Sequence, residues 1–230
     1  MAYNASMATL YVVATPIGNL EDITYRAVRI LGEVPVVAAE DTRQTRKLLD
    51  RYEIAAGTLI SCRARNEEAS SKGIVMLMDQ GKDVAYVSDA GTPGVSDPGS
   101  RLAAAVREAG HDVVPLPGAS AVTALMSVAG LAGKGFFFEG FLSPKAGRRR
   151  SRLEELLSMD RIFVLYESPF RVVKLLEDLR DLDPNRKMLL GREITKKFEE
   201  FIPGTADEVL AALEPRGTLK GEFALLVGAG

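Results

Sequence analysis

The sequence predicts an α/β fold made of two α/β domains. Short runs rich in β-branched and aromatic residues alternate with helical patterns over almost all of the 230 residues. Several of the short runs are apolar on successive residues, which is typical of strands covered on both faces in a mainly parallel sheet. The composition, 47% hydrophobic and 26% charged, is that of a globular protein.

Nine of the short apolar runs are predicted to be strands. They comprise residues 10–14, 34–39, 59–61, 84–88, 113–115, 136–140, 162–166, 188–191 and 223–227. Apolar residues at helical spacing between them predict helices with one buried face over 23–31, 102–109 and 172–179. A further helix is predicted to begin near Ser151.

A seam at Pro115–Ser120 divides the chain into halves of similar size. Two prolines stiffen this connection, which also holds a glycine, and Ser120 is a suitable N-cap for the helix that follows. We therefore expect an N-terminal α/β domain over 9–116 and a C-terminal α/β domain over 117–230. Residues 1–8, which precede the first strand, are expected to be a disordered extension.

Composition also excludes several classes of function. No apolar run approaches the roughly 20 residues of a membrane helix, and the N-terminus lacks the pattern of a secretory signal. Cys62 is the only cysteine and His111 the only histidine, so disulfides and zinc clusters are excluded and a reducing, cytoplasmic setting is expected. His111, in a Gly-His-Asp turn, is expected at the surface. Because the net charge is −2, a nucleic-acid partner would need a local basic patch.

Two loops that follow strands are candidate ligand loops. Ala14–Leu20 holds a Gly/Pro turn beyond the first strand, where α/β sheets bind ligands, and a plain tight turn is an equal alternative. The loop Ser88–Gly99 is about ten residues long and holds three glycines and two prolines, whereas a plain connection at this point needs only a few residues. Its backbone would suit an adenosine or amino-acid moiety, since glycine permits close approach and proline stiffens the loop. Small residues at Pro117–Ala121 offer a weaker third candidate.

Charged residues mark further candidate positions. The cations of Lys145–Arg152 fall where a helix is predicted to begin, and there they oppose the helix dipole. An anion-binding role, such as contact with RNA phosphates, therefore gains weight over a merely solvated face. Polar residues also follow strands at Glu40–Arg43, Tyr166–Arg171 and Gly191–Lys196, where binding and helix capping stay open as alternatives.

Taken together, these segments resemble the tetrapyrrole (corrin/porphyrin) methylases, in particular the branch that methylates a cytidine ribose 2′-hydroxyl in the decoding region of small-subunit (16S) rRNA. The motifs run in order along essentially the whole chain. They are ATPIGNL with EDIT, AAEDTR with Thr45, VSDAGTPGVSDPG, PLPGASAVTAL, EGFL with Lys145, YESP with Arg171, GREITK with Glu199, and KGEF.

The resemblance implies an S-adenosylmethionine-dependent enzyme that holds its donor in a cleft between two α/β domains, works as a homodimer and needs no metal. It places the donor against a set of loop residues, namely Thr15, Pro16, Ser88, Asp89, Ala90, Gly91, Thr92, Pro93, Gly118, Ala119, Ser120 and Tyr166. It also implies a surface for 16S rRNA or the small ribosomal subunit around Lys145, Arg148, Arg149 and Arg150.

Two departures from the branch bear on mechanism. The branch commonly has histidines where this chain has Cys62–Asn66, and usually one where Phe170 stands. A ribose hydroxyl is weakly acidic, so a base or a charge that stabilises the alkoxide would help the transfer. With histidine nearly excluded, the candidate catalytic residues are the carboxylates Glu40, Asp41, Glu167 and Glu193 and the cations Lys145 and Arg171.

Two rival functions remain open. A small-molecule tetrapyrrole methylase of the same fold would need an apolar cleft for a macrocycle and would leave the basic cluster without a purpose. A non-catalytic RNA-binding assembly factor would retain the fold without measurable affinity for the methyl donor.

Overall fold

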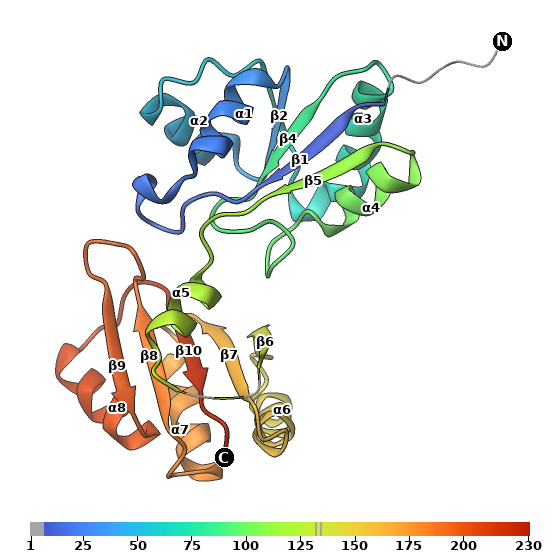
Figure 1. The fold of residues 1–230 in the computed structure, drawn as a ribbon. Coiled ribbons are helices and arrows are strands. Elements are labelled where there is room, and N and C mark those ends of the chain that lie inside the picture. Colours follow the sequence, from blue (N-terminus) through green and yellow to red (C-terminus); the bar gives the residue numbers. More distant parts are fainter. Residues whose placement is uncertain (1–6, 132, 134) are drawn as a thin grey trace. The chain divides into compact units, whose positions relative to one another are not determined.

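A computed structural model describes residues 7–131, 133 and 135–230. The chain divides into two compact units, residues 1–120 and 121–230, each with its own five-stranded sheet (Figure 1). The division falls after Ser120, whereas the sequence places it after residue 116. Of the expected extension over 1–8, only Met7 and Ala8 lie within the described residues. Ala8 is buried, and its carbonyl accepts a hydrogen bond from the Asp112 amide at 3.1 Å.

The first unit is built on a parallel sheet in the order β3-β2-β4-β1-β5. The strands are β1 (Thr9–Val13), β2 (Val36–Ala39), β3 (Thr58–Ser61), β4 (Val84–Val87) and β5 (Asp112–Leu116). Every pairing in this sheet is parallel. The carboxyl ends of all five strands therefore lie at the same edge, which is where ligands bind in sheets of this kind.

Helices cover both faces of this first sheet. They are α1 (Tyr25–Glu33), α2 (Thr42–Arg51), α3 (Glu67–Met78) and α4 (Ser100–Glu108), with 3-10 turns at Leu20–Asp22 and Ala64–Asn66. Val36 packs with α3 and α4 in one core cluster, and its neighbour Val37 packs with α1 and α2 in another. Successive residues of a strand point to opposite faces, so both must be apolar, as the uninterrupted apolar runs predict.

The second unit holds a mixed sheet in the order β6-β7-β10-β8-β9. Its strands are β6 (Phe136–Phe141), β7 (Ile162–Glu167), β8 (Met188–Arg192), β9 (Glu200–Gly204) and β10 (Phe223–Val227). Only β6 and β7 pair in parallel, so the expectation of a mainly parallel sheet is wrong for this unit. Strand β9 was not predicted. It contains Pro203 and lies at the sheet edge, where a missing N–H is tolerated.

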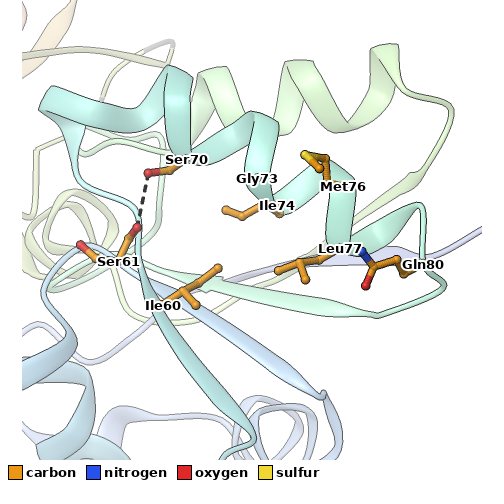
Figure 2. Close-up of a pocket in the computed structure, with 8 residues that line it drawn as sticks. All are labelled: Ile60, Ser61, Ser70, Gly73, Ile74, Met76, Leu77 and Gln80. Carbon is orange, nitrogen blue, oxygen red and sulfur yellow. Dashed lines mark hydrogen bonds between the residues drawn. The ribbon is translucent and has the colours of Figure 1, made fainter.

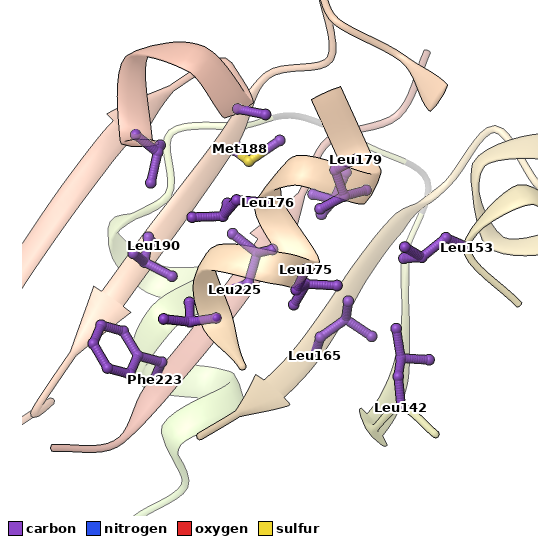
Figure 3. Close-up of a cluster of buried hydrophobic side chains, with 14 of the residues drawn as sticks. Leu142, Leu153, Leu165, Leu175, Leu176, Leu179, Met188, Leu190, Phe223 and Leu225 are labelled. Carbon is purple, nitrogen blue, oxygen red and sulfur yellow. The ribbon is translucent and has the colours of Figure 1, made fainter. Parts of the chain in front are cut away.

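The helices of this unit are α5 (Ala121–Val128), α6 (Ala146–Ser158), α7 (Val172–Leu182) and α8 (Ala206–Leu213), with a 3-10 turn at Glu214–Arg216. Leucines of α7 pack against β7, β8 and β10 in the main core cluster (Figure 3). Helix α6 begins at Ala146 rather than near Ser151, so the basic run lies inside the helix and not before it. Within the described residues, no helix has the length and apolarity needed to cross a membrane.

Candidate functional site

In the first unit, the loop after β4 is hydrogen-bonded to the segments that follow β1, β2 and β5. The closest pairing joins it to the segment after β1. The Thr15 amide donates to the Gly91 carbonyl at 2.9 Å, and the Gly91 amide donates to the Thr15 carbonyl at 3.0 Å. Gly91 has φ +76°, a left-handed conformation that favours glycine. Two of the loops predicted to bind a ligand are therefore joined into one surface.

A second link joins this loop to the segment after β2. The Asp89 amide donates to Glu40 Oε2 at 3.3 Å, and the Asp89 carboxylate accepts from the Asp41 amide at 2.9 Å. Burial raises the pKa of Glu40 above that of an ordinary glutamate. Asp41 caps α2, and hydrogen bonds from Arg43 hold the pKa of Asp41 well below its usual range. The two adjacent carboxylates thus differ in basicity.

A third link joins the loop to the segment after β5, because Thr92 Oγ1 donates to the Ala119 carbonyl at 3.3 Å. Next to it, Gly118 lies so close to the end of β1 that a Cβ there would approach the Ala14 Cβ to 2.9 Å. The structure therefore brings together the predicted residues of 15–16, 40–41, 88–93 and 118–119. A ligand at this edge would meet backbone and small side chains.

Glu67, at the start of α3, holds the end of this loop where α4 begins. The sequence did not predict this role. Its buried carboxylate accepts hydrogen bonds at Oε1 from the amides of Gly99, Arg101 and Leu102, at 2.9, 3.0 and 3.2 Å. These N–H groups at the start of α4 have no acceptor within their own helix. Glu67 therefore acts as an N-cap of α4 although it belongs to another helix. The Asn66-Glu67 pair at the start of α3 is the only sequence signal, and it does not reveal a partner more than thirty residues away.

In the second unit, predicted residues gather at the carboxyl end of β7. Glu167 is buried, and its Oε1 accepts from the Ser168 amide at 2.6 Å and from Arg171 Nε at 2.7 Å. Its Oε2 is buried without a hydrogen-bond partner among the described residues. Arg171 also donates to the Leu142 carbonyl at 3.4 Å, which ties the segment after β7 to the segment after β6. Contact of Tyr166 with a donor stays a prediction.

Glu193 belongs to a separate charged network. Its Oε1 accepts from Lys196 Nζ and from the Glu222 amide, both at 3.0 Å, and Lys196 also pairs with the Glu222 carboxylate at 2.9 Å. Burial acts to raise the pKa of Glu193, but these hydrogen bonds leave it lowered. This network joins the GREITK and KGEF motifs, and it makes Glu193 a weak proton acceptor.

The four predicted RNA-contacting cations have different surroundings. Arg149 is buried on α6, and its Nε pairs with Asp178 of α7 at 2.6 Å, so its charge is satisfied within the fold. Arg150 is half-buried and lies 3.5 Å from Asp181. Lys145, at the N-cap, and Arg148, in the first turn, are exposed, and neither side chain forms an ion pair within the described part of the chain.

The family model described as Tetrapyrrole (Corrin/Porphyrin) Methylases matches residues 9–210. The chain belongs to this family. A relative of this methylase is "Ribosomal RNA small subunit methyltransferase I" of Neisseria meningitidis serogroup A / serotype 4A (strain DSM 15465 / Z2491). It is 49% identical over 220 residues, which are 95% of this chain and 75% of the relative.

Solved structures share the fold of the methylase. Diphthine synthase matches with a TM-score of 0.75 at 15% identity, over 96% of this chain and 90% of that one. Uroporphyrin-III C-methyl transferase from Thermus thermophilus, complexed with S-adenosyl homocysteine, matches with a TM-score of 0.65 at 21% identity, over 96% and 97%. At these identities the likeness concerns the fold alone.

The lone histidine and the lone cysteine of the methylase are structural. The expectation of a surface histidine is wrong, since His111 is buried; its Nε2 lies 3.0 Å from Asp79 Oδ1, and its Nδ1 accepts from the Ala8 amide at 3.4 Å. Cys62 is also buried, and burial raises the pKa of its thiol to about 11. In the part of the chain that the structure describes, no group of acidic, histidine or cysteine side chains could hold a metal ion.

A hollow elsewhere on the first unit involves none of the predicted residues. It lies between β3 and α3, and Ser70 Oγ donates to the Ser61 carbonyl at 3.3 Å across one end (Figure 2). Ile60, Ile74, Met76 and Leu77 give it a largely apolar lining. It is an open groove beside the sheet edge and is distinct from the loops that follow β1 and β4.

Proposed function

We propose that this chain transfers a methyl group from S-adenosylmethionine to the 2′-hydroxyl of a cytidine ribose in small-subunit (16S) rRNA. The observation that carries the proposal is the 49% identity, over 95% of the chain, to a protein named as a small-subunit rRNA methyltransferase. The cytidine and the ribose oxygen follow from the branch-specific motifs, among them GREITK and YESP.

The donor would be held by the loops that meet beyond β1, β4 and β5. Their residues fit such a group because Gly91 and Gly118 keep the backbone accessible, and because the Thr15–Gly91 pair and the Thr92–Ala119 contact fix the loops. When bound, the donor supplies a sulfonium methyl group that an oxygen nucleophile displaces directly. The loops contribute by orientation, and holding reactants in line is worth roughly 7–11 kcal/mol in favourable cases.

Glu40 is the carboxylate best suited to take the ribose proton. As the oxygen–methyl bond forms and the sulfur–methyl bond breaks, the hydroxyl proton must leave for a base. A useful base has a pKa near the working pH, and burial moves the pKa of Glu40 in that direction. Asp41 and Glu193 have lowered pKa values and engaged oxygens. Glu167 is already bound to Arg171.

The rRNA surface would be carried by Lys145 and Arg148, with Arg150 at its margin. Both cations are exposed at the start of α6, where the helix dipole disfavours positive charge. Folding alone gives no reason for charge at this position, and phosphates would compensate it. We leave Arg149 out of this surface because Asp178 already neutralises it.

We further propose that the chain works as a homodimer in the cytoplasm, where ribosomal subunits are found. The family resemblance supports the dimer, and sedimentation velocity at micromolar concentration tests it. A sedimentation coefficient typical of 24.8 kDa at every concentration would contradict it.

The proposed function is tested by incubating the chain with methyl-labelled donor and small ribosomal subunits that lack the modification. Label is expected in the rRNA and absent from subunits that already carry the methyl group. A tetrapyrrole offered in a parallel reaction should remain unlabelled. Label in the tetrapyrrole alone would establish the small-molecule rival, and no measurable donor binding by calorimetry would establish the non-catalytic one.

A further inference from the structure

Two phenylalanines are exposed at the edge of the second sheet where β6 and β7 end. Phe141 ends β6 and is 57% exposed, and Phe170 follows β7 and is 89% exposed. Strands β6 and β7 are parallel neighbours, so their carboxyl ends lie at the same edge of the sheet. Two aromatic rings that remain in water do not contribute the free energy of burial that would favour folding. Their exposure therefore calls for an explanation outside the fold.

A β-bulge sets the direction of Phe141. The register between β6 and β7 shifts between Phe138 and Gly140, which makes Glu139 the extra residue. With this insertion, Phe138 and Phe141 face the same side of the sheet. Both rings meet the Tyr166 ring edge-on, with centroids 5.0 and 5.7 Å apart. One side of Phe141 is thus fixed against Tyr166 while more than half of the residue remains exposed.

The segments that carry the two rings are also fixed to each other. Arg171 follows Phe170 directly, and its guanidinium reaches both the Glu167 carboxylate at 2.7 Å and the Leu142 carbonyl at 3.4 Å. Leu142, next to Phe141, is itself buried in the main core cluster. Both rings are therefore presented from anchored backbone, which lowers the entropy lost on binding.

Positive charge follows Phe141 closely in the sequence. Lys145 and Arg148 begin α6 only a few residues after Phe141, and both are exposed. Aromatic rings beside cations are the combination that binds single-stranded nucleic acid, because bases stack on the rings while phosphates pair with the charges. A second copy of this chain would have to desolvate the cations, so charge complementarity favours a polyanion.

We propose that Phe141 and Phe170 are stacking platforms for unpaired bases of the rRNA substrate, positioned beside the phosphate contacts of Lys145 and Arg148. The proposal rests on the proposed function and assigns recognition of bases, rather than of backbone, to these two side chains. They are positioning residues: they hold the RNA strand and take no part in the transfer of the methyl group or the proton.

The test measures steady-state methyl transfer to unmodified small subunits by Phe141→Leu, Phe170→Leu and the double variant. Leucine keeps an apolar side chain but removes the flat ring. We expect each single change to raise the KM for subunits by about 5-fold to 100-fold, with the KM for the donor and kcat little changed. Phe141→Trp and Phe170→Trp should keep the wild-type KM for subunits, because indole stacks at least as well as phenyl.

The matched control is Phe136→Leu, which removes an exposed ring (45%) from the amino end of the same strand. It should keep the wild-type KM. A second readout is salt: the phenylalanine variants should keep the wild-type slope of log KM against log salt, whereas Lys145→Ala should reduce it by about 0.7.

Wild-type KM in the double variant would overturn the inference, provided that the wild-type chain methylates the subunits. Absence of methyl transfer by the wild-type chain would instead defeat the proposed function itself. If the double variant changes the sedimentation coefficient and leaves the KM unaltered, the rings belong to a contact between copies of the chain, and the inference is likewise wrong.

Discussion

Thr15 and Gly91 exchange two backbone hydrogen bonds, at 2.9 and 3.0 Å, and so join the segments that follow β1 and β4. The pair is an isolated antiparallel bridge beyond the edge of a parallel sheet. The long loop after β4 is thereby tied to the end of β1, and it also contacts the segments after β2 and β5. We regard this bridge as the framework of the donor site.

The bridge depends on the left-handed backbone of Gly91. In Gly91→Ala, a Cβ would lie 3.3 Å from Ile17 Cγ2, and the left-handed conformation would cost about 1–2 kcal/mol. We expect the Kd for the donor, measured by calorimetry, to rise by about tenfold. Gly110→Ala is the matched control, because Gly110 has φ +84° with nothing within 4 Å. It should lose similar stability and keep donor affinity; equal affinity losses would refute the prediction.

Removal of the Glu67 carboxylate should destabilise the first unit. Glu67→Ala leaves three amides at the start of α4 without their acceptor, and we expect the free energy of unfolding in urea to fall by about 2–3 kcal/mol. Glu68→Ala is the control, since its contact with Lys72 is exposed and should be worth less than about 0.5 kcal/mol. If the two variants were equally stable, the capping role would be incorrect.

His111 should matter for stability and not for catalysis. It accepts the Ala8 amide through Nδ1 at 3.4 Å, and its Nε2 lies 3.0 Å from Asp79 Oδ1. His111→Ala should lower the free energy of unfolding by about 1–3 kcal/mol and leave kcat within twofold of wild type. A large loss of kcat in a variant that unfolds normally would show instead that the histidine is catalytic.

Glu40 and Asp41 should respond to amide substitution in opposite ways. The pKa of Glu40 is raised, so its ionisation costs stability as pH rises through that pKa. Glu40→Gln should therefore be at least as stable as wild type at neutral pH, yet lose about 100-fold or more in kcat. The pKa of Asp41 is lowered, so its charge contributes stability that is lost as pH falls. Asp41→Asn should lose stability at neutral pH.

The pH–rate profile provides the decisive readout for this pair. With Glu40 as the base, activity should fall on the acid side at a pH above that of an ordinary glutamate, and Glu40→Gln should lack this limb. An unchanged profile in Glu40→Gln would exclude Glu40 as the base.

The sequence could predict the features that depend on residues close together in the chain. The central strands β2 and β4 were predictable because burial on both faces forces every residue to be apolar, as in Val84–Val87. The loop after β4 was predictable from its length and glycine content. Asp41 was a candidate cap and does cap α2, because an Asx side chain reaches its own helix start.

The features that sequence could not predict depend on contacts between distant segments. Arg149 looked like part of a basic surface, but Asp178, on another helix, neutralises it. Glu67 caps a helix that begins at Ser100, and no local pattern links the two. Strand β9 contains a proline, which is tolerated because the strand lies at the sheet edge, and its pairing with β8 cannot be read from the local sequence.

The most direct test of the central claim is to map the methyl group on the rRNA after reaction with unmodified small subunits. A ribose 2′-O-methyl group blocks alkaline cleavage of the adjacent phosphodiester bond. We predict one newly resistant position, at a cytidine of the small-subunit rRNA, which forms more slowly with Gly91→Ala at donor concentrations below its raised Kd. Methylation on a base atom, or label in rRNA without any alkali-resistant cytidine, would contradict the account.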